Sequence, residues 1–328
     1  MNSILISYYK NKILCMYVED SKVLDLQLFS DDEVHLKNVY IGKVKNIVSN
    51  IGAAFVEVAP SSICYLRLDE VKDITVLNRK RDKADLKQGD EILVQIVKGA
   101  VKDKAPVCSG RLRLPKEELE RVKKIAPSRT PFSVLYSGKP SYLSFFSRIP
   151  DLSAVDKVTC ADAQLFEEVD AYLADSTKTA DLRERLSAYT DDYPINKLYK
   201  VDSCIAELTS RKVWLKSGAN IVIDYTEAMT VIDVNTGKSI DVKGDDMFLQ
   251  INLEAATEAF RQIRLRNLSG MILIDFINDS EQNRAILIEK IEELASTDPV
   301  NCRYVDITGL GIVELTRAKK YKPLYEMI

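Results

Sequence analysis

Histidine is nearly absent from this sequence of 328 residues, in which His35 is the single example. Catalysis by a serine or cysteine nucleophile commonly needs a histidine beside it as the base. The sequence therefore argues against Ser–His and Cys–His chemistry. Any hydrolytic reaction must instead depend on carboxylate side chains, with or without a bound metal ion.

Cysteine pairs at the spacing of a metal site are also missing, since none of the six cysteines forms a C-x-x-C motif. With one histidine in the chain, a zinc site is not expected. Scattered cysteines in a chain that has no secretion signal are expected to be reduced thiols. Residues 1–7 lack the basic region, the long apolar core and the cleavage site of such a signal.

Long apolar runs are missing as well. No stretch approaches the roughly 18 to 20 residues that a helix needs to cross a bilayer. We therefore expect a cytoplasmic protein without a membrane partner. The 46% content of hydrophobic residues is enough for a sizeable core, and the length suggests two or three domains.

Charges of the two signs nearly balance, because 46 lysines and arginines face 49 acidic residues, for a net charge of −3. This balance argues against a protein enclosed by nucleic acid on all sides, but it allows a local basic groove. Basic residues cluster within 79–113, 261–266 and 317–322. The simplest interpretation of each cluster is a solvated face.

The first third of the chain is typical of β-structure. Residues 3–8, 12–18 and 22–28 predict a three-stranded meander, whose apolar face a later part of the chain must cover. Five further strand-like segments, ending at about residue 112, follow within residues 37–114. Five strands in so short a stretch suit a small OB-type barrel, a fold that can bind oligonucleotides.

The last two thirds alternate between helical and strand patterns. Residues 175–190 are polar and have helical spacing, which predicts a helical stretch on the surface. Residues 201–213 predict another helix. Residues 221–224 and 229–233 predict an antiparallel hairpin. An amphipathic helix over 249–266 then precedes a buried strand over 271–276 and a helix over 284–294.

Two of these apolar strands each end in an acid, Asp233 and Asp275. Side chains alternate along a strand, so Asn235 is expected on the same face as Asp233. If the helix over 249–266 is a crossover, the two carboxylates lie close together and could share one magnesium ion. Such an ion would generate hydroxide and stabilise charge on a phosphate.

The pattern leaves a simpler interpretation open. Asp233 and Asp275 could cap turns, or they could form ion pairs with Arg264 or Arg266. The segment 235–237 (NTG) also fits an ordinary turn. Spacing alone does not decide between a metal site and these structural roles.

Several long segments resemble the ribonuclease E/G family. They are residues 226–235, 252–256, 261–276 and 309–317 (TEAMTVIDVN, NLEAA, RQIRLRNLSGMILIDF and GLGIVELTR). The resemblance is dense over about 209–320 and looser over the barrel and the N-terminal strands. A match of this length is far more specific than a short motif.

The resemblance implies an α+β multidomain fold. An RNase H-like subdomain is expected from residues 1–35 plus 128–208, and a five-stranded OB-fold barrel inserted into it from 36–114. Residues 115–127 would be the remnant of a sensor region or a linker. Residues 209–328 would form a DNase I-like α/β catalytic subdomain.

The resemblance also implies an activity. Residues of the family that match Asp233 and Asp275 hold the catalytic magnesium, which manganese could replace, and the match to Asn235 orients the first of them. The implied protein is a magnesium-dependent endoribonuclease of RNA processing or decay, including rRNA processing and mRNA decay. It would hydrolyse single-stranded, AU-rich RNA to 5′-phosphate and 3′-hydroxyl products.

Three barrel residues match RNA contacts of the family. Phe55 and Tyr65 correspond to aromatic residues that contact bases, and Lys104 corresponds to a basic residue that faces RNA. Aromatic rings stack on unpaired bases and basic side chains follow the phosphates, so this role is physically reasonable. The residue pattern alone favours the barrel core for the two rings.

Two parts of the family pattern are missing. No Arg-Thr-Ala-Gly segment of the 5′-monophosphate sensor lies within residues 115–127, so sensing of the RNA 5′ end is not expected. The zinc-link cysteine pair is also missing, so a homo-oligomer would have to form through another surface. These losses leave an alternative function open, that of a non-catalytic RNA-binding accessory protein.

Overall fold

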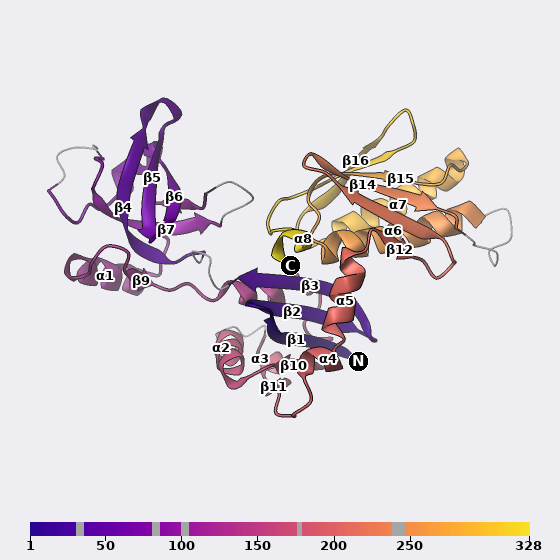
Figure 1. Cartoon of the computed structure of the whole chain (residues 1–328), viewed down its shortest axis with the longest axis horizontal. Helices are drawn as coiled ribbons and strands as arrows, with labels where there is room; N and C mark the ends of the chain where they lie inside the picture. Colours follow the sequence, from indigo (N-terminus) through magenta and orange to yellow (C-terminus); the bar gives the residue numbers. More distant parts are fainter. Residues whose placement is uncertain (31–35, 81–85, 100–104, 176–178, 238–246) are drawn as a thin grey trace. The chain divides into compact units, whose positions relative to one another are not determined.

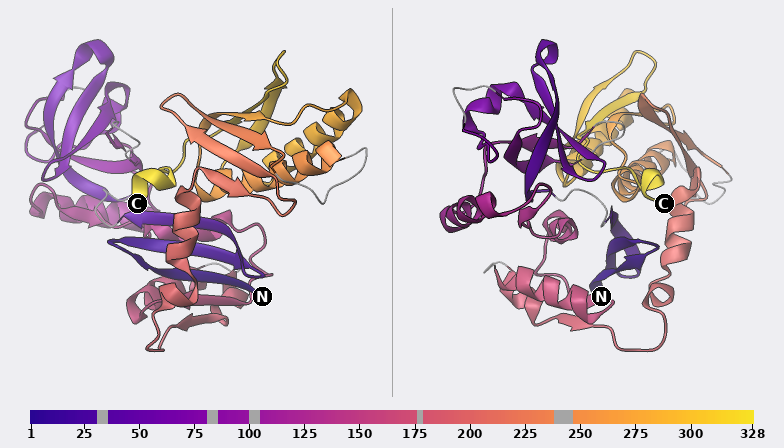
Figure 2. Two further views of the ribbon diagram at one scale, coloured as in Figure 1. Left: turned by 45° about the vertical axis from the view of Figure 1, so that its right-hand side comes forward. Right: turned by 60° about the vertical axis from the view of Figure 1, so that its left-hand side comes forward.

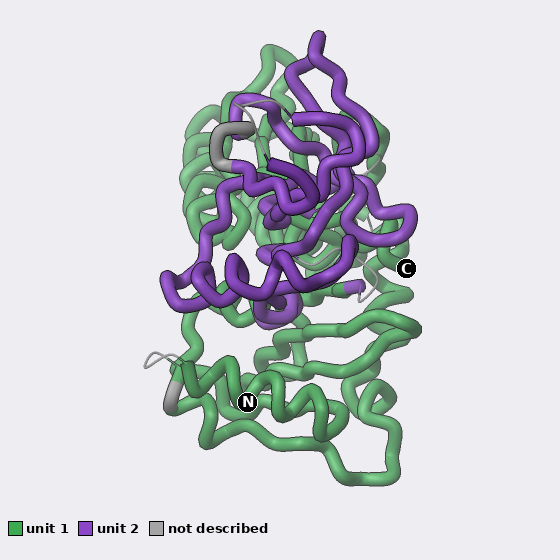
Figure 3. The backbone as a smooth tube through the Cα atoms, turned by 90° about the vertical axis from the view of Figure 1, so that its left-hand side faces the viewer, with its two compact units in different colours: residues 1–29, 144–328 green, residues 30–143 purple. Residues whose placement is uncertain are grey.

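The computed structural model describes the whole chain except residues 31–35, 81–85, 100–104, 176–178 and 238–246. Two compact units divide it, one formed by residues 1–29 and 144–328 and the other by residues 30–143 (Figure 3). Both contain β-sheets and helices, so the expected α+β class is confirmed. The domain boundaries given above stay predictions.

The second unit is built around a closed five-stranded β-barrel, which is consistent with the predicted OB-fold. Each strand pairs with two others, in the cyclic order β4, β5, β6, β8, β7 and back to β4. The barrel strands are β4 (Val39–Val48), β5 (Ala53–Ala59), β6 (Ser62–Arg67), β7 (Glu91–Lys98) and β8 (Val107–Ser109). The remaining elements of this unit are the strand β9 (Val134–Tyr136), the helix α1 (Lys116–Ile125) and the short 3-10 turns η1 (Ser49–Ile51), η2 (Leu68–Asp73) and η3 (Ala126–Ser128).

The N-terminal strands form one edge of a five-stranded sheet in the first unit, in the order β11-β10-β1-β2-β3. β10 pairs in parallel with β1 and with β11, whereas β1 and β2 are antiparallel. A buried ion pair joins Arg148 to Asp25, with its Nε 2.8 Å from Oδ2. The strands are β1 (Asn2–Tyr9), β2 (Lys12–Glu19), β3 (Lys22–Ser30), β10 (Lys157–Cys160) and β11 (Leu186–Ala188).

Later parts of the chain cover this sheet, as we expected for the apolar face of the predicted three-stranded meander. α5 (Val201–Thr209) and α8 (Leu324–Met327) lie against this sheet (Figures 1 and 2). Their buried side chains belong to one cluster with Leu5 and Leu14. Additional helices are η4 (Ser141–Arg148), α2 (Ala163–Ala174), α3 (Ala180–Arg183) and α4 (Ile195–Leu198). Apolar burial of this kind is the main stabilising term of such a layer.

The third sheet contains Asp233 and Asp275 and has six strands in the order β12-β13-β14-β15-β17-β16. The helices α6 and α7 pack their apolar sides on one face of it (Figure 1). Along β14, buried and more exposed side chains alternate, so the other face carries the exposed ones. The elements are β12 (Lys212–Trp214), β13 (Asn220–Tyr225), β14 (Met229–Asn235), α6 (Met247–Leu265), β15 (Gly270–Asp275), α7 (Glu281–Ser296), β16 (Cys302–Ile307) and β17 (Val313–Arg317).

Two helix predictions were wrong. The described part of the polar stretch 175–190 contains only the short helix α3 and the strand β11, which pairs with β10. The helix expected over 201–213 ends at Thr209, and β12 follows it as an edge strand. Among the helices that the structure describes, none has the length and apolar character needed to cross a membrane.

The basic clusters are not uniformly solvated faces. Arg317 is 1% exposed and its Nε lies 3.1 Å from both carboxylate oxygens of Asp298. Arg266 is 2% exposed, and burial lowers the pKa of its guanidinium to about 10. Both guanidinium groups are buried and hydrogen-bonded, and these hydrogen bonds allow the interior to tolerate them.

Candidate functional site

Asp233 and Asp275 occupy paired positions in the third sheet. β14 and β15 are parallel neighbours, and the register puts Asp233 opposite Asp275 at the end of β15. Neighbouring strands lie about 4.8 Å apart. Both carboxylates are exposed, whereas Ile232 and Ile274, one residue earlier on each strand, are buried toward the helices. α6 is the connection between the two strands, as the crossover hypothesis required.

Asn235 lies on the same face as Asp233. Its Nδ2 donates a hydrogen bond of 2.6 Å to Oδ2 of Asp233. This contact leaves Oδ1 of Asp233 available for another partner and restricts the rotation of the carboxylate. Asn235 is therefore placed as an orienting residue for Asp233.

The alternative partners of the two acids lie elsewhere. Arg264 donates to the carbonyl oxygen of Thr297, and Arg266 donates to the side-chain oxygen of Gln262. Within the described ranges, no Lys or Arg forms an ion pair with Asp233 or Asp275. The pairing with these arginines that spacing left open is therefore wrong.

Two residues of α6 fix the loops beside the acids. The side chain of Asn252, which is 2% exposed, donates to the carbonyl oxygen of Ile277 at 2.8 Å and accepts from its N–H at 3.0 Å. Glu254 accepts the N–H of Lys216 at 2.7 Å at the turn between β12 and β13. The resemblance included Asn252 and Glu254 in one segment but gave neither a role.

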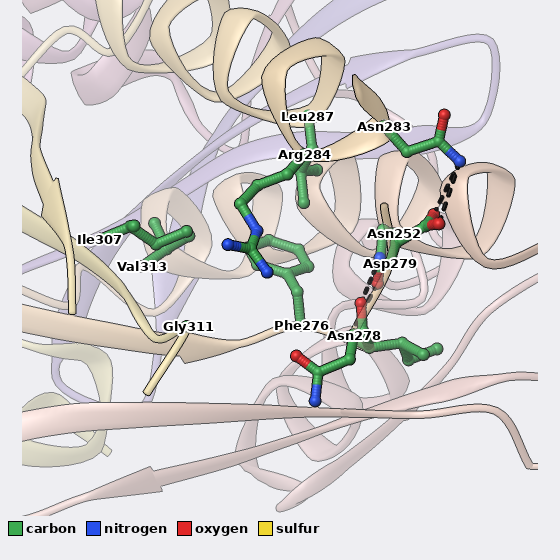
Figure 4. A pocket seen from close by; sticks show the side chains of 11 residues that line it. Asn252, Phe276, Asn278, Asp279, Asn283, Arg284, Leu287, Ile307, Gly311 and Val313 are labelled. Carbon is green, nitrogen blue, oxygen red and sulfur yellow. Dashed lines mark hydrogen bonds between the residues drawn. The ribbon is translucent and has the colours of Figure 1, made fainter. Parts of the chain in front are cut away.

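A pocket opens directly after Asp275, on the helix side of the sheet (Figure 4). Its empty space is about 340 Å³, part of which is open solvent. Arg284 extends its guanidinium from α7 into this space, toward the ring of Phe276. Arg284 has no side-chain hydrogen bond or ion pair within the part of the chain that the structure describes. Sequence reasoning did not identify Arg284.

The two candidate RNA-contacting rings of the barrel, Phe55 and Tyr65, lie outside its core. Phe55 and Tyr65 are directly paired on β5 and β6, and their rings meet edge to face with centroids 6.2 Å apart. Both side chains are partly exposed, and the buried core is formed by their neighbours in sequence. The core role that the pattern favoured for them is therefore wrong. Lys104 lies outside the described residues.

The acid pair is chemically suited to a hard divalent cation. Carboxylate oxygens are preferred ligands of magnesium, which commonly takes one or two from a protein and completes its shell with water and phosphate. No cluster of three or more His, Cys, Asp or Glu side chains with metal-binding geometry is found among the described residues. The two carboxylates with Asn235 fit the smaller magnesium arrangement.

Comparison with known proteins identifies the family. The sequence model of the ribonuclease E/G family matches residues 110–320. The chain belongs to the ribonuclease E/G family. The match includes the acid pair, Asn235 and the pocket, whereas Phe55 and Tyr65 precede it.

Relatives within the ribonuclease E/G family cover most of the chain. Ribonuclease G of Salmonella typhimurium is 28% identical over an alignment that covers 86% of this chain and 72% of that protein. Ribonuclease E of Nostoc sp. is 26% identical, with 92% of this chain and 55% of that protein covered. The ribonuclease E/G-like protein of Porphyra purpurea is 26% identical and covers 100% of this chain and 76% of its own length.

Proposed function

We propose that this protein is a magnesium-dependent endoribonuclease that hydrolyses single-stranded RNA to 5′-phosphate and 3′-hydroxyl products. The observation that carries the proposal is the register of β14 and β15, which sets Asp233 opposite Asp275 on an exposed face. Like charges at paired positions destabilise a sheet, so the arrangement favours a cation between them. The names of the relatives, Ribonuclease G and Ribonuclease E, support RNA as the substrate.

Each residue of the site has a distinct task. Asp233 and Asp275 would hold the ion, which could also be manganese, and Asn235 keeps the Asp233 carboxylate in one orientation through its hydrogen bond. When bound, the ion activates the attacking water and neutralises charge on the scissile phosphate. Asn252 holds the backbone just after Asp275, which limits the movement of that carboxylate.

Arg284 supplies a cation in the pocket that follows Asp275 in the chain. Its guanidinium extends into the pocket that follows Asp275 and can bind an RNA phosphate next to the scissile one (Figure 4). This contact would fix the register of the strand on the enzyme. The reacting phosphate itself would be bound at the acid pair.

The barrel would bind the RNA without taking part in the reaction. Phe55 and Tyr65 offer partly exposed aromatic surface to unpaired bases, and Lys104 would contact the backbone. We assign the barrel to the OB-fold, the N-terminal sheet to an RNase H-like subdomain and the region 209–328 to a DNase I-like subdomain. The boundaries are those expected from the sequence.

The biological setting follows the family resemblance. The substrates would be AU-rich RNAs of the cytoplasm, cut during RNA processing or decay.

Cleavage of a purified single-stranded RNA, with magnesium or with EDTA, tests the reaction. Asp233→Asn and Asp275→Asn should each lower kcat/KM by more than about a hundredfold, since loss of an outer-shell partner alone costs roughly 10–100-fold. Asp224→Asn is the matched control. Asp224 is exposed on the neighbouring strand β13, but Arg211 already pairs with it.

The products and RNA binding separate the possible outcomes. Fragments should be substrates for an exonuclease that requires a 5′-phosphate, and both asparagine variants should bind RNA as the wild type does. A non-catalytic accessory protein would bind RNA and give no magnesium-dependent fragments. Wild-type cleavage by both variants would overturn the assignment of the acid pair.

A further inference from the structure

Trp214 is the chain's only tryptophan, and 63% of it is exposed on the edge strand β12. Tryptophan is enriched at binding interfaces, because it combines a large apolar ring with a polar N–H. Nothing described so far gives it a role. Its position in the sheet relates it directly to the acid pair.

The strand register aligns Trp214 with the reactive end of the sheet. Trp214 pairs with Asn220, and Asn220 pairs with Asn235. In antiparallel strands, directly paired residues project from the same face. Trp214 is therefore on the face of Asn235 and two strands away, at about 10 Å.

A second row of paired residues runs beside the first. Lys212 is opposite Val222, Val222 is opposite Asp233, and Asp233 is opposite Asp275. Lys212 and Asp233 are both exposed, so the row joins a cation to the acid pair across one face of the sheet. A strand of nucleic acid that crosses this face meets the acids and then Lys212 and Trp214.

The local arrangement of Trp214 suits a nucleobase. The Nζ of Lys212 lies over one face of the indole, 4.4 Å from its centroid, within the range of a cation–π contact. This contact orients the ring and leaves the opposite face for stacking. A base stacked there would have the ammonium group of Lys212 close to its phosphate.

The distribution of charge favours an RNA path from the acid pair over β13 and β12, and disfavours a path over β17 and β16. On the other side of β15, Glu314 of β17 is paired with Leu273, and Asp306 of β16 is paired with Glu314. These two carboxylates lie nearer the acid pair than Arg303 of β16, which is paired with Thr316 on the same face. An RNA backbone that leaves in this direction is therefore repelled first, whereas Lys212 attracts it. The RNA strand therefore leaves the acid pair over β13 and β12.

We propose that Trp214 stacks an unpaired base of the RNA at most about three nucleotides from the scissile phosphate, since 10 Å is about three times the 3.4 Å rise of stacked nucleotides. This inference rests on the proposed RNA substrate and adds a specificity subsite to it. Lys212 is a positioning residue for the ring. The stacked base sets which bond reaches the acids.

The lone tryptophan gives a direct measurement. In EDTA, where no cleavage is expected, a short single-stranded RNA should quench the emission of Trp214 in the full-length protein. Anisotropy of the labelled RNA measures binding independently. Trp214→Ala should weaken binding roughly 5- to 150-fold, the range for loss of one stacked base, and Trp214→Phe should restore most of it.

An abasic scan locates the stacked base. RNAs with one abasic site at each of three positions on either side of the cleavage point are compared for kcat/KM. An abasic site at one or two of these positions should lower kcat/KM of the wild type by a factor similar to that for Trp214→Ala. The same abasic site should not lower kcat/KM of the Trp214→Ala variant any further. Tyr193→Ala, which removes another exposed aromatic ring of the same unit, is the matched control and should behave as the wild type.

Several results would overturn the inference. RNA that binds by anisotropy without quenching Trp214, with unchanged affinity of Trp214→Ala, excludes stacking. Emission that depends on protein concentration and not on RNA would show that another copy covers this face. If quenching and the Trp214→Ala loss appear but magnesium produces no cleavage, the binding subsite stands and the proposed reaction fails.

Discussion

The side chain of Asn252 holds Ile277 by both of its backbone polar groups, two residues after Asp275. A buried amide with two good hydrogen bonds is a rigid support, and here it determines where β15 ends. The position of the second acid therefore depends on a residue of α6 that does not touch the substrate.

Replacement of Asn252 by alanine tests this support. The variant leaves the N–H and carbonyl of Ile277 without partners, at a cost of about 1–3 kcal/mol for each buried group. A carboxylate displaced by about 1 Å can lose roughly a hundredfold in rate. We expect kcat to fall by about that factor with little change in KM.

The control for Asn252→Ala is Thr257→Ala, which removes an exposed hydroxyl bonded to Leu253 on the same helix. It should retain the wild-type kcat. Equal kcat values for Asn252→Ala and the wild type, measured in single-turnover reactions, would exclude a positioning role.

Asn235→Ala should weaken the site without removing a ligand. The variant loses the 2.6 Å hydrogen bond to Asp233, and loss of such outer-shell contacts lowers metal affinity or activity about 10- to 100-fold. The magnesium concentration for half-maximal cleavage should rise. Asn235→Ala combined with Asp233→Asn should be no worse than Asp233→Asn alone, because both act on one carboxylate. Additive losses would contradict that coupling.

Arg284→Gln should affect binding more than chemistry. A hydrogen bond to a charged group contributes about 1.5–3 kcal/mol, so we expect KM to rise at least about tenfold with kcat nearly unchanged. Arg284→Lys should recover part of the loss. Lys290→Gln is the control on the same helix, since Lys290 is paired with Glu293. A fall in kcat alone would instead place Arg284 at the reacting phosphate.

The rings of the barrel should contribute to RNA affinity independently of the acids. Phe55→Ala and Tyr65→Ala should each weaken RNA binding in EDTA by roughly 5- to 150-fold, the range expected for one stacked base. Ile63→Ala, on the same strand as Tyr65 and 41% exposed, should have no such effect. Unchanged affinity of the double variant would remove the barrel face from the RNA path.

Asp90 predicts a pH dependence of barrel stability. Burial raises the pKa of Asp90, but hydrogen bonds from Arg79 at 2.6 Å and from the N–H of Lys87 at 2.8 Å outweigh it, so the net pKa is lowered. The folded state thus favours the carboxylate. The contribution of the Asp90 carboxylate to barrel stability is complete above its pKa in the unfolded chain, about 3.9. This contribution is lost as the pH falls through the pKa of Asp90 in the folded protein.

Asp90→Asn should therefore destabilise the barrel by about 1–3 kcal/mol near neutral pH, and by progressively less below about pH 4. The difference in unfolding free energy between the wild type and Asp90→Asn can be measured by hydrogen exchange of the β7 amides in urea. The measurement is made near neutral pH and again below about pH 4. A difference that stays constant or grows in acid would contradict the lowered pKa.

Local patterns predicted much of this fold. The alternation in residues 229–235 identified β14 and its exposed face, and the 3.6-residue spacing over 249–266 identified α6. Two short edge strands, β11 and β12, were missed, because three residues carry little periodicity. β12, for example, pairs with β13, which follows it in the sequence, and buries only Val213 in the core.

The site was predicted only in part for a related reason. The sequence identified Asp233 and Asp275, but not their register, since parallel neighbours are joined through a long crossover. Arg284 had no distinguishing pattern until its pocket was visible. Arg317 looked like part of a basic surface because its partner, Asp298, is 19 residues away.

The packing of α8 has a consequence for synthesis of the protein. Leu324 and Met327 belong to the same buried cluster as Leu5 and Leu14 of the first two strands. A nascent chain on the ribosome can cover part of this apolar side with α5, but the part that α8 covers stays open until residue 327 has emerged. Chaperones that hold exposed apolar segments would have their longest opportunity at the beginning of this chain.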